Sequence, residues 1–531
     1  QIEAGDVAGA YETIERGRAA VLRSQLASTI ADPLASAVPA EAKRLRELES
    51  TARAEYSIAK SKLQNALRHN SKSSEPSKDA IQRMSEEVRL KQRNLVSVEA
   101  EIRTASPQYR EALARIETVW PLTELQEYLQ QKNAVFLEYA IWRSAGYVLV
   151  VSGKSPPSIE ALFISPESAA VLGTTPGPLT ADRCRLALVN RSGTGVYQQI
   201  ATAVEPLSTK SLLALTALSD SLLPSYLQED LNGNKVQQLI VAPDAPHALL
   251  PFEVLLPGEF NTDRYLLDLT SSVTYTPSAT VLRTLLDKKT PTKATGPGTG
   301  ALIVGDPEYT KYTSSTRSLA PQSLYQGLGG KLSKLVHAGL ECTWITDTFR
   351  KENIATTTLL NANATEQAVF KSAPQKQLIH FACHGFADDR FGNAFGALAI
   401  SPGSASGNLA DDGVLTLNEI SRLDLKSCEL AILSACETNI GPEQRSEGVW
   451  SLSRGFLIAG SHRVAATNWM VDDEATASLV SYFCSGIAQD WNLPAGPNYA
   501  KRLHDAKRWV RQQEKWKSPY FWGSFVLVGP N

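Results

Sequence analysis

The feature that most limits the fold is a change of pattern after residue 120. Before it, long stretches have helical composition. After it, short runs rich in β-branched and aromatic residues, such as AVFLEYAIW (residues 134–142) and GYVLVVSG (146–153), alternate with helical stretches such as residues 278–286. Strands that alternate with helices are typical of α/β domains. The sequence therefore predicts an α/β fold preceded by a helical region.

The helical region contains two amphipathic stretches separated by a polar segment. Apolar residues recur at spacings of three and four, first at Leu45, Leu48, Ala52, Ala59, Leu63 and Ala66 and then at Ile81, Met84, Val88, Leu95, Val98 and Ile102. The segment between them, NSKSSEPSKD (residues 70–79), has the composition of a turn. We predict an antiparallel helical hairpin, which serves either as a solvated spacer or as an arm that binds a partner.

The length of 531 residues fits about three domains at roughly 100–200 residues each. A second boundary is indicated by DKKTPTKATGPGTG (residues 287–300), whose proline, glycine, lysine and threonine content is typical of a linker. We therefore predict a helical region over residues 1–120, a first α/β half over 121–290 and a second over 300–531.

Composition excludes several classes of function. With 53 Lys and Arg against 55 Asp and Glu, the net charge of -2 argues against binding nucleic acid or a membrane surface through general basic charge. The six cysteines form no C-x-x-C pair or zinc spacing, so we expect reduced thiols, no metal or other cofactor, and a cytoplasmic protein. We see neither a secretory signal nor a run of about 18 apolar residues. A nucleotide hydrolase is disfavoured because G-x-x-x-x-G-K-[ST] does not occur.

Two strand-like runs end at residues that could carry hydrolytic chemistry. QLIHFACHGFADD (residues 377–389) places His384 directly after Cys383, but neighbouring residues of a strand point to opposite faces, so these two are poor partners. In CELAILSACETNIG, Cys436 follows a second apolar run. Strand ends hold the reactive groups of parallel sheets, and the separation of 52 residues is close to the roughly 50 found in caspases. Cys436 is therefore the better partner for His384.

Several blocks of the sequence together resemble the CHAT domain, a caspase-like module often fused to tetratricopeptide repeats. They include LIHFACHGFADDRFGNAFGALAIS, LTLNEISRLDLKSCELAILSACETNIG and SPYFWGSFVLVG, with LIVAPDAPHALLPFEVL and LIVGDPEY upstream in the expected order. The resemblance implies a caspase-like α/β fold with an inactive pseudo-caspase half followed by an active half. It also implies that the helical start is the end of a repeat array. Cys383 departs from the pattern, where small or β-branched residues are more usual.

The resemblance further implies a cysteine endopeptidase of the caspase and separase type, with His384 as base and Cys436 as nucleophile. The backbone N–H groups of Gly385 and Cys436 would form the oxyanion hole. The chemistry agrees, because the thiolate is the attacking species and a nearby imidazolium favours it. The rival hypothesis is a non-catalytic scaffold or interaction protein with the same fold. The partners expected for the enzyme are a protein substrate and an activating protein on the helical region.

Four further candidate sites are present in the sequence. Asp472 and Asp473 in NWMVDDEATASLV resemble a block that lines the S1 pocket, where a carboxylate would pair with a cationic P1 side chain; alternatively, they begin a helix. His380 is expected to be a core or supporting histidine. His247 lies in the first half, where we find no cysteine at a matching strand end. The loop TNIGPEQRSEG (residues 438–448) is predicted to be a switch.

Overall fold

The computed structural model describes most of the chain. The described residues are 5–19, 22–23, 25–26, 38–68, 78–105, 114, 116–190, 192–258, 264–288, 299–309, 332–387, 396–403, 411, 413–441, 443–444, 448–449 and 451–531. The predicted turn at 70–79 and the predicted linker at 287–300 lie largely outside these residues. The chain divides into two compact units, one formed by Gln1–Leu22, Val119–Lys311 and Ser333–Asn531 and the other by Arg23–Thr118 and Tyr312–Leu332.

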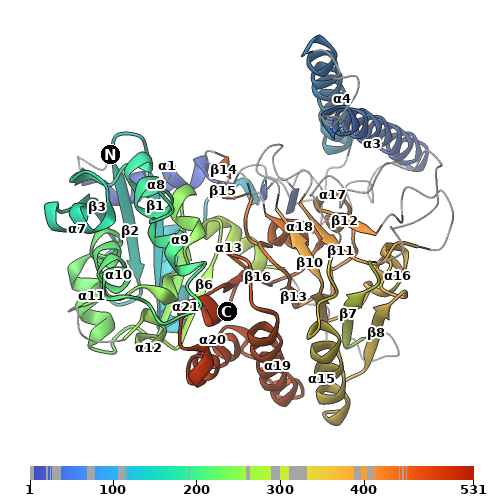
Figure 1. Cartoon of the computed structure of the whole chain (residues 1–531). Helices are drawn as coiled ribbons and strands as arrows, with labels where there is room; N and C mark the ends of the chain where they lie inside the picture. The colour runs from blue at the N-terminus through green and yellow to red at the C-terminus, as the bar shows by residue number, and fades with distance from the viewer. Residues whose placement is uncertain are drawn as a thin grey trace. The chain divides into compact units, whose positions relative to one another are not determined.

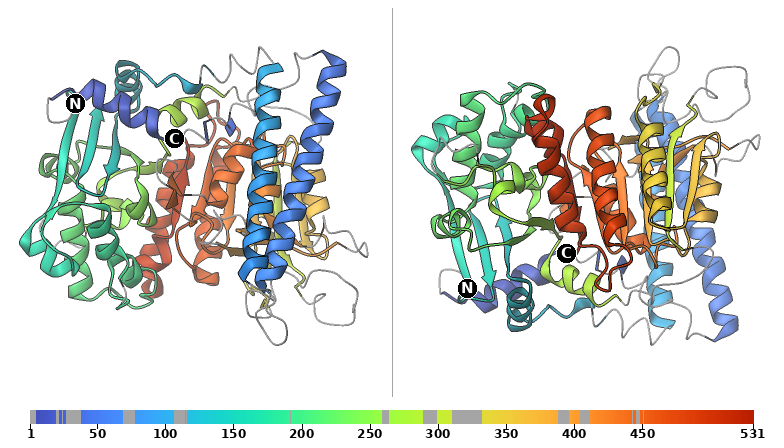
Figure 2. Two further views of the ribbon diagram at one scale, coloured as in Figure 1. Left: turned by 90° about the horizontal axis from the view of Figure 1, so that it is seen from above. Right: turned by 90° about the horizontal axis from the view of Figure 1, so that it is seen from below.

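The second unit contains the two long helices that the sequence predicts. They are α3 (Pro39–Arg68) and α4 (Lys78–Ala105), which lie side by side in Figure 2. Leu45 and Ala52 near the start of α3 share a buried cluster with Val98 and Ile102 near the end of α4, so the helices are antiparallel. The predicted hairpin is confirmed. Its membership of a tetratricopeptide array stays a prediction.

The first unit is built on one mixed sheet (Figure 1). Within the described residues it has twelve strands in the order β4-β3-β2-β1-β5-β6-β17-β16-β13-β9-β7-β8. The strands are β1 (Ala134–Ile141), β2 (Gly146–Ser152), β3 (Ser158–Ile164), β4 (Gly177–Pro178), β5 (Gln238–Ala242), β6 (Ser272–Tyr275), β7 (Ala301–Pro307), β8 (Thr356–Asn361), β9 (Leu378–Ala382), β13 (Leu430–Ser434), β16 (Val464–Thr467) and β17 (Phe525–Val528). The predicted α/β fold is confirmed.

Helices cover this sheet, and two short ladders extend from it. The helices are α1 (Val7–Gly17), α6 (Leu122–Lys132), α7 (Pro166–Leu172), α8 (Ala181–Leu188), α9 (Val196–Ile200), α10 (Thr209–Leu222), α11 (Ser225–Asn232), α12 (Leu266–Leu269), α13 (Ala279–Leu286), α15 (Ala338–Lys351), α16 (Glu366–Ser372), α17 (Leu417–Ile420), α18 (Leu452–Ala459), α19 (Asp473–Asp490), α20 (Tyr499–Arg511) and α21 (Pro519–Trp522), with 3₁₀ turns η1 (Ala245–Leu249), η2 (Phe252–Val254) and η4 (Glu514–Trp516). The ladders are β10 (His384–Phe386), β11 (Ala397–Ala399) and β12 (Val414–Thr416), and β14 (Glu443–Gln444) with β15 (Gly448–Val449).

Strand direction divides the sheet into two halves. One group of parallel strands contains β1, β5, β6 and β17. A second group contains β16, β13, β9, β7 and β8. The two groups meet at the antiparallel pair β16–β17. Counted along the chain, the five strands of the second group have the order 2-1-3-4-5, with the topological switch between β7 and β9. Open α/β sheets bind ligands beyond the carboxyl ends of their strands at such a point. The topology therefore directs attention to the residues that follow β7 and β9.

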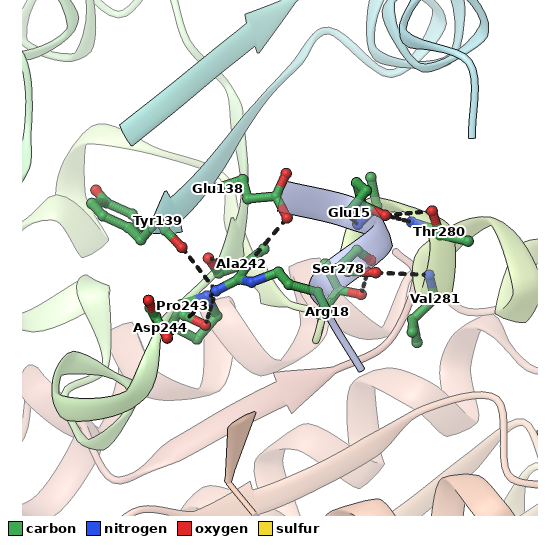
Figure 3. A network of polar contacts seen from close by, with 12 residues as sticks. Glu15, Arg18, Glu138, Tyr139, Ala242, Pro243, Asp244, Ser278, Thr280 and Val281 are labelled. Atoms are coloured by element: carbon green, nitrogen blue, oxygen red, sulfur yellow. Dashed lines mark hydrogen bonds and ion pairs between the residues drawn. The ribbon is translucent and has the colours of Figure 1, made fainter. Parts of the chain in front are cut away.

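Helix α1, although it precedes the long hairpin in the chain, is anchored in the first unit (Figure 3). The Glu15 carboxylate accepts hydrogen bonds of 2.8 Å from the backbone N–H groups of Ala279 and Thr280. These donors begin α13, where a helix has unpaired N–H groups and favours a negative charge. Glu15 thus fastens α1 to the start of α13.

Arg18 makes the second anchor at the end of α1 (Figure 3). Its guanidinium donates to the carbonyls of Tyr139 at 2.8 Å, Pro243 at 3.0 Å and Ala242 at 3.3 Å, and lies 3.2 Å from Glu138 Oε1. These carbonyls lie in or directly after β1 and β5. A planar group with five donors suits such a set of acceptors. Arg18 therefore covers the carboxyl ends of two strands in the first half.

Candidate active site

His384 and Cys436 follow two neighbouring strands at matching positions. β9 and β13 are parallel, with Ala382 opposite Ser434, so each predicted catalytic residue lies two positions beyond this pair. Both predicted catalytic residues therefore follow the carboxyl ends of neighbouring strands at matching positions. Cys383, which directly follows β9, is fully buried.

The backbones of Gly385 and Cys436 lie against each other. A Cβ atom added to Gly385 would lie 2.4 Å from the carbonyl oxygen of Cys436 and 3.3 Å from its nitrogen. Any other residue would force the two segments apart, so the glycine is required for this close approach. The two residues predicted to form the oxyanion hole are thus brought together.

The contacts of His384 go to residues that sequence reasoning did not identify. Its Nε2 lies 2.8 Å from the carbonyl oxygen of Ser333, and its backbone N–H donates to the hydroxyl of Tyr309 at 3.3 Å. The rings of Tyr309 and His384 are 5.2 Å apart. A carbonyl only accepts, which assigns the proton of the neutral ring to Nε2 and leaves Nδ1 as acceptor. Among the described residues, no hydrogen bond joins His384 to Cys436.

The Cys436 thiol is half-buried. Burial raises the pKa of the thiol, and the carboxylates of Glu437 and Asp473 raise it further, whereas a hydrogen bond with the backbone of Val471 lowers it. A raised pKa keeps sulfur in its protonated form, which is the weaker nucleophile. Closer approach of the His384 ring would be needed to favour the thiolate.

The turn after Cys436 is held to the end of β16. Glu437 has a φ of 53°, a left-handed conformation that is uncommon for a residue with a side chain. Thr467 N–H donates to Thr438 Oγ1 at 2.9 Å, and the Asn439 side chain donates to Asn468 Oδ1 at 2.8 Å. Backbone strain of this kind persists where the surroundings fix it. These contacts therefore set the position of Cys436. Residues 442 and 445–447 of the predicted switch loop lie outside the described residues.

Asp472 and Asp473 both have structural partners. Asp472 is the N-cap of α19, and its Oδ1 accepts from Ala475 N–H at 2.8 Å. Asp473 Oδ2 accepts from the backbone N–H of His337 at 2.8 Å, which joins the starts of α19 and α15. The alternative interpretation, in which the aspartate begins a helix, is confirmed for Asp472. Asp473 also raises the pKa of the Cys436 thiol, so it acts electrostatically on the site, while an S1 role for either residue stays a prediction.

Among its described residues, the first half offers no comparable pair of reactive side chains. His247 in η1 is fully buried, with its ring 4.5 Å from that of Tyr139 and 6.0 Å from that of Phe252. Burial lowers the pKa of His247 to about 3, which keeps it neutral. Cys184, the one cysteine of residues 121–290, lies buried in α8 rather than at a strand end.

Two general features of the described residues bear on cofactors and membranes. Their histidine, cysteine, aspartate and glutamate side chains form no group of three or more that could hold a metal ion. None of the helices within the described ranges has both the length and the apolar character that a membrane crossing requires.

Comparisons with known proteins identify the family. The separase–securin complex of Saccharomyces cerevisiae is similar over 90% of this chain and 37% of that chain, with 11% identity and a TM-score of 0.43. The Arg specific cysteine proteinase gingipain R is similar over 58% of this chain and 67% of that chain, with 9% identity and a TM-score of 0.37. A complex of the pro- and mature domains of RgpB from Porphyromonas gingivalis gives 9% identity over 58% of this chain and 69% of that one, with a TM-score of 0.36. This chain thus spans well under half of the separase chain, and no curated protein matches it. Residues 213–530, more than half of the sequence, match the CHAT domain family, and the chain therefore belongs to that family.

Proposed function

We propose that the protein is a cysteine endopeptidase that uses His384 and Cys436. The observation that carries the proposal is their matched position beyond the carboxyl ends of neighbouring parallel strands. Membership of the CHAT domain family supports it. The close approach of Gly385 to Cys436 supports it as well, because two backbone N–H groups can then point to one oxygen.

The proposed reaction follows the chemistry of these groups. The Cys436 proton passes to Nδ1 of His384, and the sulfur attacks the peptide carbonyl. The N–H groups of Gly385 and Cys436 stabilise the oxyanion, and the imidazolium then protonates the leaving amine. Water hydrolyses the acyl-enzyme with His384 as base. The carbonyl of Ser333 orients the His384 ring and stabilises its charged form. In catalytic triads, the third residue has the same task.

Hydrolysis of a degenerate peptide library by the purified chain tests this proposal. We expect cleavage that disappears in Cys436→Ala and persists in Cys383→Ser, since Cys383 is fully buried. The rival scaffold function has one observation in its favour, the raised pKa of the Cys436 thiol. Cleavage that is equal in the wild type and in folded Cys436→Ala would exclude the proposed nucleophile, and no cleavage in either would favour the scaffold.

Specificity for a cationic P1 residue is the second part of the proposal. Asp473 is the stronger candidate for the S1 carboxylate, because Asp472 already caps α19 and Asp473 acts on the Cys436 thiol. The same library, scanned at P1, should show a preference for Arg or Lys that collapses in Asp473→Asn while the protein stays folded. A preference for Asp or apolar P1 residues would contradict this role.

Activation by a partner protein on the helical region is the third part. The missing hydrogen bond between His384 and Cys436, both of them described residues, and the raised pKa of the thiol support a resting state with low activity. The α3–α4 hairpin, a compact unit with its own core, is the candidate receiving surface. Full activity of the purified chain, unchanged when a short linker replaces residues 39–105, would contradict this regulation.

A further inference from the structure

A buried acid–base pair lies behind the candidate catalytic residues. Nε2 of His380 on β9 is 2.9 Å from Oε1 of Glu341 on α15, and their side chains are 0% and 2% exposed. The other carboxylate oxygen accepts a hydrogen bond of 3.0 Å from the hydroxyl of Ser434 on β13. His380 precedes His384 by four residues, and Ser434 precedes Cys436 by two. The Glu341 carboxylate thus connects the two strands that carry the proposed dyad.

The pair lies on the face of β9 that α15 covers. His380 and Ala382 share one parity along β9, and Ala382 is opposite Ser434 in the register. Phe381 has the other parity, and its ring packs 5.7 Å from that of Phe456 on α18. The two faces of β9 therefore contact different helices, α15 and α18.

The charge of the Glu341 carboxylate needs compensation in this environment, because a buried charge is tolerated only when it is paired and hydrogen-bonded. The titratable groups that face it from other positions are thiols, Cys342 on α15, Cys484 on α19 and Cys383 after β9. Burial above all, and also the Glu341 carboxylate, raise the pKa of each of these thiols. Neutral thiols provide no positive charge, so His380 is the group that can supply it.

We propose that the buried His380–Glu341 pair acts as a positioning unit for the dyad. Through Ser434 it holds the ends of β9 and β13 in register. The inference rests on the proposed function, because it explains how the thiol of a working peptidase would be supported.

The test is the rate at which iodoacetamide alkylates Cys436 in the purified chain between pH 6 and pH 10, followed by mass spectrometry of the peptide that contains it. We expect His380→Gln to slow alkylation at pH 7 several-fold, since Glu341 then no longer links β9 to Ser434 on β13. The double variant His380→Gln/Glu341→Gln should be no slower than the slower single variant, because all of these variants break the same link.

A matched control breaks another buried pair. Lys507 on α20 is paired with Glu253 of η2, and both side chains are nearly inaccessible. Lys507→Gln should lower stability without moving the alkylation profile. A His380→Gln profile that is also unmoved, with a similar loss of stability, would reduce the His380–Glu341 pair to ordinary packing and overturn the inference.

Further variants keep the inference testable if His380→Gln does not fold. Ser434→Ala removes only the link to β13 and should slow Cys436 alkylation several-fold at an unchanged midpoint. Unchanged rates in both Ser434→Ala and Glu341→Gln would overturn the inference. A wild-type Cys436 that shows no reactivity above that of the five buried thiols would instead overturn the proposed function, and the inference with it.

Discussion

In the first half of the sheet, the carboxyl ends of β1 and β5 are covered by Arg18, whereas in the second half the residues after β9 and β13 are His384 and Cys436. In each half, the two strands named are parallel and largely buried. In the first half, the strand-end carbonyls accept hydrogen bonds from a guanidinium at the end of a helix more than a hundred residues away in sequence. In the second half, a half-buried imidazole and a half-buried thiol follow the two strands at matching positions.

The two histidines show what this difference means chemically. His247 is enclosed by aromatic rings, and its pKa is lowered to about 3, so it stays neutral and has no access to a substrate. His384 is partly accessible and is oriented by the Ser333 carbonyl. The two halves of the sheet therefore differ in chemistry, which depends on the side chains at the strand ends.

The largest expected effect concerns the reactive residues. Cys436→Ala and His384→Ala should each lower kcat/KM for peptide cleavage by at least about 10³-fold, or roughly 4 kcal/mol, because they remove nucleophile or base. His247→Gln should stay within about threefold of the wild type at pH 7. Steady-state kinetics with a cleavable peptide provide the measurement. If Cys383→Ser alone abolished cleavage in a folded protein, the choice of thiol would be wrong.

Arg18 gives the second largest effect, on stability. Arg18→Met should reduce the free energy of unfolding by about 3 kcal/mol, since it leaves the buried Glu138 and several strand-end carbonyls without their donor. Arg16 on the same helix is the matched control. Its side chain is 70% exposed and pairs with Glu12 on the surface, so Arg16→Met should change stability by less than about 0.5 kcal/mol. Equal losses in urea denaturation would contradict the role given to Arg18.

The third effect is a pH dependence of stability. Because the pKa of His247 is about 3 when folded and about 6.5 when unfolded, the unfolded chain binds the extra proton between these values. The contribution of His247 is fully present above pH 6.5 and is lost as the pH falls, by about 2 kcal/mol at pH 5. Urea denaturation at pH 7 and pH 5 should therefore show a smaller acid-induced loss in His247→Gln than in the wild type. An identical loss in wild type and His247→Gln would contradict the burial of the His247 ring.

The smallest expected effect separates helix capping from substrate binding in the second half. Asp472→Ala should lower the free energy of unfolding by about 1 kcal/mol, whereas Asp472→Ser keeps an N-cap oxygen and should lose only a few tenths. Thermal unfolding measures both variants. A changed P1 preference in Asp472→Ser at retained stability would give Asp472 a part in the pocket and would weaken the assignment of Asp473.

The sequence predicted those features that depend on side-chain type and strand period. The apolar runs before His384 and Cys436 indicated buried parallel strands, and the alternation of faces excluded Cys383 as a partner for His384. No sequence pattern could indicate the role of Ser333, because its backbone carbonyl makes the contact with His384 and every residue has such a carbonyl. The role of Arg18 could not be predicted either, since an arginine at the end of a helix is ordinarily exposed to solvent.

Covalent labelling of the six cysteines by a peptidyl electrophile at pH 7, mapped by mass spectrometry in the wild type and in His384→Ala, tests the central claim most directly. Five of the thiols are buried, and Cys436 is partly accessible. The account predicts an adduct on Cys436 that forms at least about 100-fold more slowly in His384→Ala, because the imidazole generates the thiolate. An adduct on another cysteine, or a Cys436 rate that does not depend on His384, would contradict it.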